Sequence, residues 1–269
     1  MGDDPEGLDA DIAAYYEGGR EQQRLSTISR FEFIRTQELL RRFLPSPPAR
    51  LLDVGGGAGG HALPLMAAGY AVHLVDPVGL HVEQARAAGV AHASVGDARS
   101  LRLGDDSFDA VLLLGPLYHL TDRRDRIAAL AEARRVVRPG GAVIVAVISR
   151  FASLFSGLVE RFLDDATFEA IVDVDLGRGL HVNPDRRPGW FTTAYFHHPS
   201  EIPAELDEAG LEPRDVIAVE GAASVLADID FWFDDDVRRE RLLRLVRATE
   251  AEPSILGVSS HIVVVGRRH

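Results

Sequence analysis

The residue types best suited to ligand chemistry gather between positions 51 and 60. Asp53 closes a short apolar run, and five glycines follow within residues 55–60. Glycine adopts positive φ angles and lets the backbone approach a bulky ligand, so this order predicts a buried strand that runs into a ligand-binding turn. The next segment has helical spacing, which places the turn at a strand-to-helix junction of the kind that binds nucleotide-like ligands.

The glycines alone leave the ligand open. Gly55, Gly57 and Gly60 fit the spacing GxGxxG, whereas Gly55, Gly57 and Gly59 fit GxGxG, so dinucleotide cofactors and S-adenosylmethionine both remain candidates. Asp76 follows the second predicted strand and does not separate them. A carboxylate at that place can accept both ribose hydroxyls of either cofactor.

The elements that must position these residues alternate between strand and helix from residue 50 onward. ArgProGlyGly at 138–141 predicts a helix stop and a turn. The alternation predicts an α/β fold with a Rossmann-like, doubly wound, mostly parallel sheet that has helices on both faces. The expected strands are 50–54, 71–75, 92–95, 108–114, 142–148, 213–220 and 261–268, and the expected helices are 59–68, 80–88, 123–137, 151–171, 199–209 and segments within 222–250.

Two stretches depart from this alternation, and we expect them to cap the sheet. The N-terminal region has helical patterns at 8–18 and 20–44, which ProSerProPro ends. Residues 149–198 mix a helical pattern with an irregular aromatic stretch, and a segment of this length between strands is usually a lid or a substrate-binding insertion. The expected units are a helical cap at 1–48, a cofactor-binding core at 49–148, an insertion at 149–198, and the remainder of the same core at 199–269.

Composition excludes several classes of function. The chain has 269 residues, of which 46% are hydrophobic, so it can bury a large core. A formal net charge of −12 argues against nucleic acid as a partner, because that affinity rests on Lys and Arg. The sequence has no cysteine and no HxxxH spacing, so we expect no metal site. It has no long apolar run and an acidic start, so we expect a cytoplasmic protein without a membrane segment.

Three features around the glycine turn resemble the class I S-adenosylmethionine-dependent methyltransferases. Asp53 precedes the glycines, where dinucleotide folds usually have an apolar residue. GlyAspAlaArgSerLeu at 96–101 follows the third predicted strand, and PheAspAlaValLeuLeuLeuGlyProLeuTyrHisLeu at 108–120 is similar to the family's fourth strand and the loop after it. The resemblance implies S-adenosylmethionine as cofactor, S-adenosylhomocysteine as product, and a seven-stranded sheet with an antiparallel last strand.

The resemblance also implies roles for residues at matching positions. Asp53 would support the turn, Asp76 would hold the ribose, and Asp97 would receive the adenine amino group. The other cofactor contacts that the resemblance implies are Gly55, Gly57 and Gly59 at the methionine and ribose parts, Pro77 and Ala98 on either side of the adenine, and the backbone of Leu114 or Gly115 at the methionine amino group.

The N-terminal region has a narrower likeness. TyrTyrGluGlyGlyArgGluGlnGlnArgLeu at 15–25 and PheIleArgThrGlnGluLeuLeu at 33–40 resemble helices that close over the cofactor in small-molecule methyltransferases of bacterial secondary metabolism. Tyr16, Arg24 and Arg35 are then candidates to contact the cofactor carboxylate or to cover the site. An amphipathic surface helix would carry similar arginines, so that alternative stays open for both.

Methyl transfer from a sulfonium is an in-line displacement, so the protein mainly has to align the reacting groups away from water. A hydroxyl or carbon-acid acceptor would need a base beside the methyl, and His119 is the best placed residue because it follows the fourth strand. Tyr118 could orient the acceptor, and a purely structural role is the alternative for His119.

The insertion would build the acceptor pocket, although packing alone would explain its aromatic residues. The pocket candidates are His181, Trp190, Tyr195 and His197.

These features favour a methyltransferase that acts on a small-molecule acceptor. The ending ProSerIleLeuGlyValSerSerHisIleValValValGlyArg also resembles the C-terminus of bacterial tRNA carboxymethoxyuridine methyltransferases, which makes a tRNA-modifying enzyme the second hypothesis. A third hypothesis, of another class, is a non-catalytic module that binds S-adenosylmethionine or S-adenosylhomocysteine as a partner or sensor. An NAD-dependent dehydrogenase is the least supported.

Overall fold

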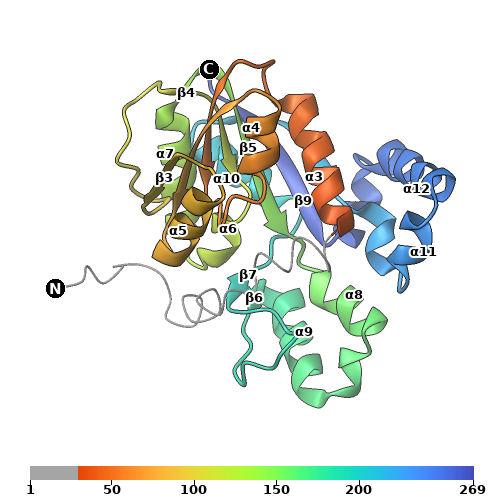
Figure 1. Cartoon of the computed structure of the whole chain (residues 1–269). Helices are drawn as coiled ribbons and strands as arrows, with labels where there is room; N and C mark the ends of the chain where they lie inside the picture. Colours follow the sequence, from red (N-terminus) through yellow and green to blue (C-terminus); the bar gives the residue numbers. More distant parts are fainter. Residues whose placement is uncertain (1–29) are drawn as a thin grey trace.

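Helices enclose a seven-stranded sheet in the computed structural model, which describes residues 30–269 (Figure 1). The strand order is β3-β2-β1-β4-β5-β9-β8, and β9 alone among these strands runs in the opposite direction to the rest. The mostly parallel sheet with an antiparallel last strand is therefore confirmed. Its strands are β1 (Arg50–Val54), β2 (Ala71–Asp76), β3 (His92–Val95), β4 (Phe108–Leu113), β5 (Val137–Ile148), β8 (Glu212–Ala218) and β9 (His261–Arg267).

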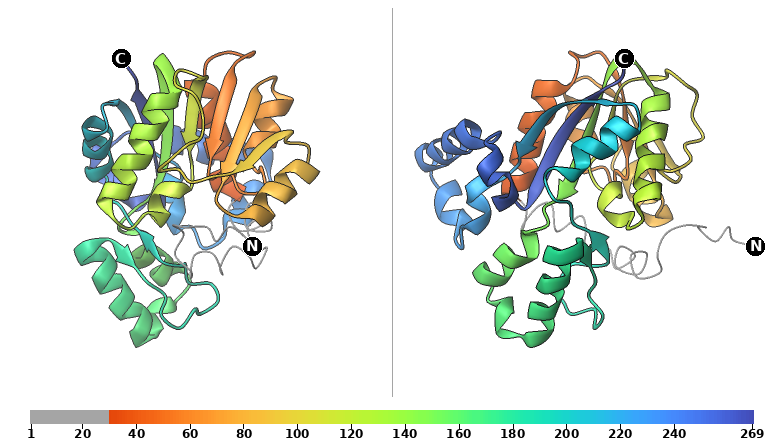
Figure 2. Two further views of the ribbon diagram at one scale, coloured as in Figure 1. Left: turned by 90° about the vertical axis from the view of Figure 1, so that its left-hand side faces the viewer. Right: turned by 180° about the vertical axis from the view of Figure 1, so that it is seen from behind.

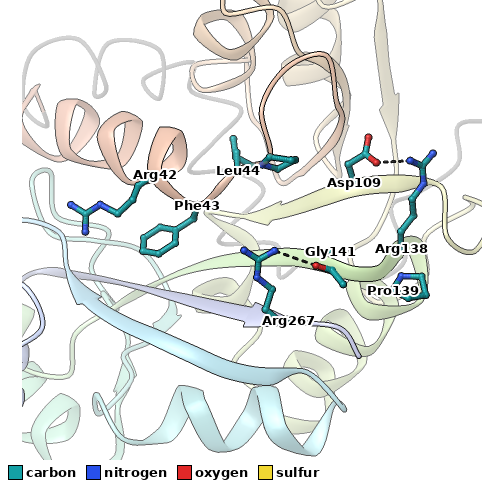
Figure 3. Close-up of a pocket in the computed structure, with 10 residues that line it drawn as sticks. Arg42, Phe43, Leu44, Asp109, Arg138, Pro139, Gly141 and Arg267 are labelled. Atoms are coloured by element: carbon teal, nitrogen blue, oxygen red, sulfur yellow. Dashed lines mark hydrogen bonds and ion pairs between the residues drawn. The ribbon is translucent and has the colours of Figure 1, made fainter.

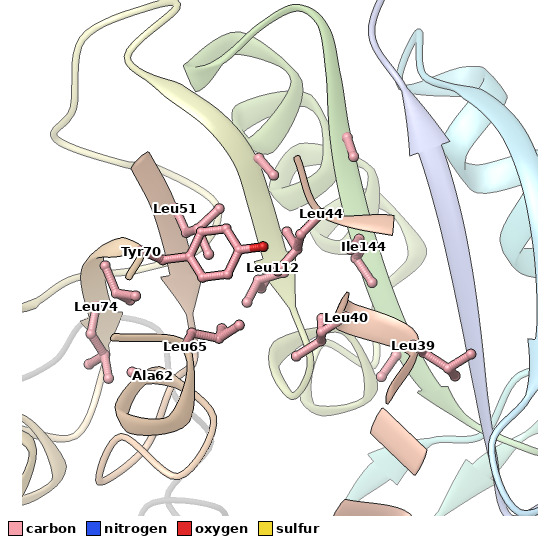
Figure 4. Packing of buried hydrophobic residues seen from close by; sticks show 14 of the residues in the cluster. Leu39, Leu40, Leu44, Leu51, Ala62, Leu65, Tyr70, Leu74, Leu112 and Ile144 are labelled. Atoms are coloured by element: carbon pink, nitrogen blue, oxygen red, sulfur yellow. The ribbon is translucent and has the colours of Figure 1, made fainter. Parts of the chain in front are cut away.

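Successive strand residues fill one hydrophobic cluster on each face of the sheet, because side chains alternate along a strand. Leu51 belongs to the cluster that α3 (Arg30–Phe43), α4 (Ala62–Ala67) and α5 (Gly79–Ala87) complete, and Figure 4 shows residues of α3 and α4 around it. Leu52 belongs to the opposite cluster, which α7 (Arg123–Val136) and α10 (Glu201–Glu208) close. This is the two-sided burial that consecutive apolar residues in a strand predict.

Residues 149–198, which we call the insertion, form a small unit beyond the carboxyl ends of β4 and β5 (Figures 1 and 2). Its elements are α8 (Ala152–Val159), η1 (Phe162–Asp164), α9 (Ala166–Arg178) and the antiparallel pair β6 (Leu180–His181) and β7 (Ala194–Tyr195). The single helix expected over 151–171 is wrong. Arg161 adopts a left-handed φ of 60°, and Asp165 then caps a new helix by accepting the N–H of Thr167 at 2.8 Å.

The ArgProGlyGly segment does not form the separate turn that was expected. β5 begins at Val137, directly after α7, and includes Gly140 with a φ of 77°. Val137 pairs with Phe108, whereas Ala142 pairs with Ala110, so the residues between them form an irregularity within the ladder. The local turn signal is therefore absorbed into the start of the strand.

The helical segments after β8 pack against α3 at the far edge of the sheet. They are η2 (Gly221–Val225), α11 (Ile229–Phe233), α12 (Asp236–Thr249) and η3 (Pro253–Val258). The rings of Phe31 and Phe233 meet edge to face with centroids 5.6 Å apart. No helix within residues 30–269 combines the length and apolar character needed to cross a bilayer.

Candidate cofactor and acceptor site

The glycine turn lies at the carboxyl end of β1, where the strand order reverses between β1 and β4. The N–H of Gly55 donates to the carbonyl of Val75 at 2.7 Å. A Cβ at Gly55 would lie 2.9 Å from Cδ of Pro116, the first residue of α6 (Pro116–His119). Position 55 therefore needs glycine because α6 packs directly against the turn.

Gly57 requires glycine for a different reason. Its φ is 57°, and no atom of the described residues lies within 4 Å of the place that a Cβ would occupy. The amide of Gly57 donates to Oδ2 of Asp76 at 2.9 Å, which ties the turn to the end of β2. At Gly59, by contrast, a Cβ would lie 3.1 Å from the side chain of Val90. The open cradle of the turn is therefore at Gly57.

Asp76 is buried and holds the loop together. Besides the amide of Gly57, its carboxylate accepts the N–H of Val78 at 2.9 Å and lies 3.0 Å from Nδ1 of His81. Oδ2 receives one of these three contacts, so it retains a lone pair. Its predicted contact with ribose stays a prediction that would use this lone pair.

Asp53 lies beneath the turn, and no cationic side chain within residues 30–269 forms an ion pair with it. It is 1% exposed, and its Oδ2 has no hydrogen-bond partner among residues 30–269. The Cβ position of Gly56 is 2.8 Å from this oxygen, so the turn covers the carboxyl group closely. Burial raises the pKa of Asp53 to about 7, and the nearby charge of Asp76 adds to this effect. An unpaired acid under an open cradle suits a ligand with positive charge.

Asp97 is paired with an arginine that sequence reasoning missed. Nη2 of Arg99 lies 2.5 Å from Oδ2 of Asp97, and Nη1 of Arg99 bonds Asp125 at 2.7 Å. Burial alone would raise the pKa of Asp97, but hydrogen bonds from Arg99 outweigh it and lower the pKa. Pro77 is half-buried and Ala98 is 8% exposed within the core, so their predicted contacts with adenine, like that of Asp97, stay predictions.

The end of β4 brings α6 beside the turn. A Cβ at Gly115 would lie 3.4 Å from both the carbonyl oxygen of Gly55 and the hydroxyl of Tyr118, while half-buried Leu114 packs into the core. Nδ1 of His119 is 3.4 Å from the carbonyl of Thr193 in the insertion. Apart from Arg35, the structure therefore brings the predicted cofactor contacts within residues 30–269 and the predicted catalytic residues to one edge of the sheet.

The insertion places its four candidate pocket residues in three different settings. His181 is buried beside Asp175 of α9. Trp190 packs into the insertion's own core, with its ring 4.9 Å from that of Phe168, and its place in the acceptor pocket stays a prediction. Tyr195 and His197 lie where the insertion rejoins the sheet, in contact with the charged side chains described next.

A buried ion pair supports this junction. Arg126 of α7 bonds Glu205 of α10 at 2.8 Å, stacks on Tyr195 at 3.8 Å and donates to the carbonyl of Leu120 at 2.9 Å. Burial alone would raise the pKa of Glu205, but hydrogen bonds from His197 and Arg126 lower it to about 2. Burial lowers the pKa of His197, so Arg126 is the cation that balances Glu205.

Replacing Arg126 with methionine should lower the free energy of unfolding by about 3–5 kcal/mol, because a buried carboxylate would lose its cation. Arg124→Met is the matched control, since Arg124 lies on the same helix and its side chain is exposed. That control should cost at most about 1 kcal/mol. Urea unfolding measures both, and equal losses in the two variants would contradict the assignment. Arg126→Met combined with Glu205→Met should regain most of the loss.

The structure places Arg35 away from the predicted cofactor contact. Its guanidinium is fully buried and bonds Glu250 at 2.5 Å, Glu38 at 2.8 Å and the carbonyl of Val219 at 3.1 Å. Val219 follows β8, which is four strand positions from β1. Arg35 therefore fastens α3 to the far edge of the sheet. Tyr16 and Arg24 lie outside the described residues.

One group of possible metal ligands comes together that the sequence did not indicate. Single ligand atoms of Glu32, Glu220 and His261 all lie within 4.8 Å of one another. His261 Nδ1 is 2.6 Å from Glu220, which also accepts the hydroxyl of Ser259 at 2.8 Å. Hydrogen bonding therefore accounts for the closeness of these side chains.

A pocket of about 370 Å³ lies at the opposite edge of the sheet (Figure 3). Arg42, Arg138 and Arg267 line it, but Glu250 and Asp109 pair with the first two. Arg267 donates to the carbonyl of Gly140 at 3.2 Å. Ligands of doubly wound sheets bind at the carboxyl ends of the strands, so this pocket is separate from the candidate site.

Comparisons with known proteins agree with this geometry. Residues 52–145 match the family described as "Methyltransferase domain". A ubiquinone/menaquinone biosynthesis C-methyltransferase of Acidiphilium cryptum is 37% identical over 123 residues, which are 42% of this chain and 48% of that protein. A probable tRNA methyltransferase 9B of Homo sapiens is 34% identical over 112 residues, or 40% of this chain and 24% of that protein.

Solved structures share the whole fold. A S-adenosylmethionine-dependent methyltransferase of Thermotoga maritima, described as a possible histamine N-methyltransferase, has a TM-score of 0.61 and 22% identity, covering 95% of this chain and 98% of that one. At this identity the likeness shows the fold alone. The two sequence relatives are matched over less than half of their own lengths.

The fold thus defines a doubly wound sheet of the kind that binds nucleotide-like cofactors at its carboxyl edge. The matched segment contains the glycine turn and the strands around it. The chain belongs to the class I S-adenosylmethionine-dependent methyltransferases, and S-adenosylmethionine is the cofactor of this family. The family and the cofactor predicted from the sequence are confirmed.

Proposed function

We propose that this chain transfers the methyl group of S-adenosylmethionine to a small-molecule acceptor bound between α6 and the insertion. The observation that carries the proposal is the position of Phe191, whose ring stacks on His119 at 5.8 Å and meets Tyr118 edge to face at 6.0 Å. The insertion thereby covers the residues beside the glycine turn with aromatic side chains. A covered, aromatic site suits a small molecule.

The residues present fit the cofactor. S-adenosylmethionine supplies an electrophilic methyl group on a positively charged sulfur. The unpaired carboxyl of Asp53 and the carboxylate of Asp76 favour positive charge near the turn, and Gly57 leaves room along the backbone. Asp97 stays anionic and can accept a hydrogen bond from an amino group. The remaining work of the protein is to align the acceptor and exclude water.

His119 and Tyr118 border the proposed acceptor space. The contact of His119 Nδ1 with the carbonyl of Thr193 holds the imidazole between α6 and the insertion. Its role as a base for a hydroxyl or carbon-acid acceptor remains a proposal, supported by its place after β4 and beside the turn. Tyr118 is buried under Phe191 and would shape the pocket wall.

The formal charge of −12 does not favour the tRNA-modifying alternative, although one relative carries a tRNA methyltransferase name. The quinone-biosynthesis relative acts on small molecules by its name, which supports the main proposal. In both cases the match covers less than half of either protein.

Calorimetry with S-adenosylmethionine, followed by incubation with the methyl-labelled cofactor and a panel of phenols, amines and carboxylic acids, tests this function. We expect saturable binding and a labelled small molecule. Failure to bind the cofactor at about millimolar concentration, a level that detects even weak sites, would contradict the proposal. Binding without product on the panel would favour the non-catalytic module, and label found only on added tRNA would favour the tRNA-modifying enzyme.

A further inference from the structure

His181 and Asp175 form a buried pair inside the insertion that the proposed function has not used. Nδ1 of His181 lies 2.8 Å from Oδ2 of Asp175, and the hydroxyl of Ser153 donates to the same oxygen at 2.5 Å. His181 is 1% exposed and Asp175 is 0% exposed. The three residues come from β6, α9 and α8, so the fold of the insertion fixes their arrangement.

Asp175 determines which ring nitrogen of His181 carries the proton. A carboxylate oxygen accepts hydrogen bonds, so Nδ1 is the protonated nitrogen and Nε2 keeps its lone pair in the neutral ring. Nε2 is buried and has no hydrogen-bond partner among the described residues. A buried polar atom left unpaired costs about 1–3 kcal/mol, and such atoms call for an explanation in function.

Aromatic rings connect this pair to the proposed acceptor space. Phe196 stacks on the imidazole of His181 with centroids 4.7 Å apart and planes 9° from parallel. The Phe191 ring lies 6.3 Å from that of His181 and 5.8 Å from that of His119. Phe191 is therefore a shared neighbour of the buried pair and of α6, which adjoins the glycine turn.

We propose that the acceptor is an aromatic compound with a phenol- or enol-type hydroxyl, and that Nε2 of His181 takes the proton of this hydroxyl. This inference rests on the proposed function. Half-buried Phe191 offers a ring for a flat acceptor, and movement of Phe191 would open the way to Nε2. Asp175 stabilises the imidazolium ion that forms, as a carboxylate does in other histidine pairs.

The step balances in protons and electrons. The hydroxyl proton passes to Nε2 of His181, and an oxygen lone pair forms the new bond to the methyl carbon. The bond from that carbon to sulfur breaks, and its electron pair stays on sulfur as the positive charge there is neutralised. The imidazolium of His181 then returns its proton to solvent.

Nitrogen-15 NMR of the histidine-labelled protein tests the first part without any reaction. His181→Asn identifies the signals of His181. At pH 8 we expect Nδ1 to be protonated and Nε2 to give the downfield shift of an unprotonated ring nitrogen. A proton on Nε2 at this pH, in either the other tautomer or the imidazolium, would overturn the inference.

Kinetics with two phenols test the second part. Asparagine keeps an N–H near the position of Nδ1 for Asp175 but lacks Nε2, so His181→Asn preserves the packing contact. With phenol, we expect kcat to fall about 100-fold at pH 7 while the affinity for S-adenosylmethionine is unchanged. With 4-nitrophenol, which ionises readily in water, the loss should shrink as the pH rises. If His181 had a purely structural role, His181→Asn would lower kcat equally with both phenols at every pH.

Two histidine variants complete the experiment. His198→Asn makes the same change at an exposed histidine that ends the insertion and whose Nδ1 bonds Ser200 at 2.8 Å, and it should leave the methylation of both phenols unaffected. His119→Asn tests the other candidate for the base. The inference fails if His119→Asn, and not His181→Asn, loses kcat more with phenol than with the more acidic 4-nitrophenol. It also fails if wild-type protein methylates amines or acids but neither phenol, a result that would leave the proposed function standing. If the wild-type protein did not bind S-adenosylmethionine, the proposed function itself would be rejected.

Discussion

Replacing Gly57 with leucine is expected to weaken S-adenosylmethionine binding by about 100-fold or more, a loss of about 2.7 kcal/mol. The Cβ of residue 57 would point into space that the described residues leave empty, while the amide of the same residue is bonded to Asp76. A leucine side chain would therefore fill the cradle without striking the protein. Calorimetry measures the change in affinity.

The same substitution also strains the backbone, because non-glycine residues rarely adopt a φ near 57°. Gly140→Leu is the matched control for this strain. Gly140 has a φ of 77°, its N–H is hydrogen-bonded, and its Cβ would also meet no described atom within 4 Å, but it lies at the opposite edge of the sheet. Each variant should lose about 1–2 kcal/mol of stability, and only Gly57→Leu should lose the cofactor. Equal affinities would show that the cradle at Gly57 does not receive it.

The sheet could be predicted from the sequence because its signals are local. Each strand is a short apolar run that a turn or a helical pattern follows, and the consecutive Leu51 and Leu52 are typical of a strand buried on both faces. The signal of the glycine turn is equally local, since its five glycines lie within six positions. The seven-stranded sheet and its reversed last strand came from the family resemblance, because pairing between distant strands leaves no local signal.

The supports of the site could not be predicted, because they join residues that are far apart in the chain. Arg126 meets Glu205 and Arg35 meets Glu250 across 79 and 215 positions, and nothing beside either arginine indicates its partner. The pairing of Asp97 with Arg99 was easier to predict, because the two residues are only two positions apart. An arginine so near an acid in a turn is a signal that could have been used.

The insertion shows the same limit in a different form. Its helical pattern was visible, but the break at Arg161 depends on a left-handed residue that carries no glycine signal. The buried pair of His181 and Asp175 spans six positions and two elements, so the sequence indicated a histidine but not the acid that orients it. Candidate residues could thus be named by type, whereas their chemistry depended on neighbours supplied by the fold.

Asp53→Asn is expected to make the protein more stable than wild type above pH 7 and to leave stability nearly unchanged near pH 4. Burial, together with the charge of Asp76, raises the pKa of Asp53 to about 7 in the folded protein, whereas the unfolded chain has a value near 3.8. Between these values the folded state keeps a proton that the unfolded state has lost. The free energy of unfolding therefore falls as pH rises through this window, by up to about 4 kcal/mol.

Urea unfolding of both proteins from pH 4 to pH 8 measures this difference. Asparagine cannot ionise, so the part of the pH slope that Asp53 causes should disappear in the variant. Asp215→Asn, which changes an exposed carboxylate on β8, should keep the wild-type slope. Identical slopes in wild type and Asp53→Asn would mean that Asp53 does not retain its proton in the folded state.

The instability of ionised Asp53 should be relieved by the cofactor, because a positively charged ligand at the turn favours the carboxylate form. S-adenosylmethionine binding near pH 6.5 should then release part of a proton from the wild-type protein, and its affinity should increase with pH up to about 7. Calorimetry in two buffers of different ionisation enthalpy detects the released proton. Asp53→Asn should release a smaller fraction of a proton on binding, and it should bind the cofactor more weakly at pH 8. If the variant bound equally well and released as much, the positive charge of the cofactor would lie away from Asp53, and the glycine turn would hold the ligand by shape alone.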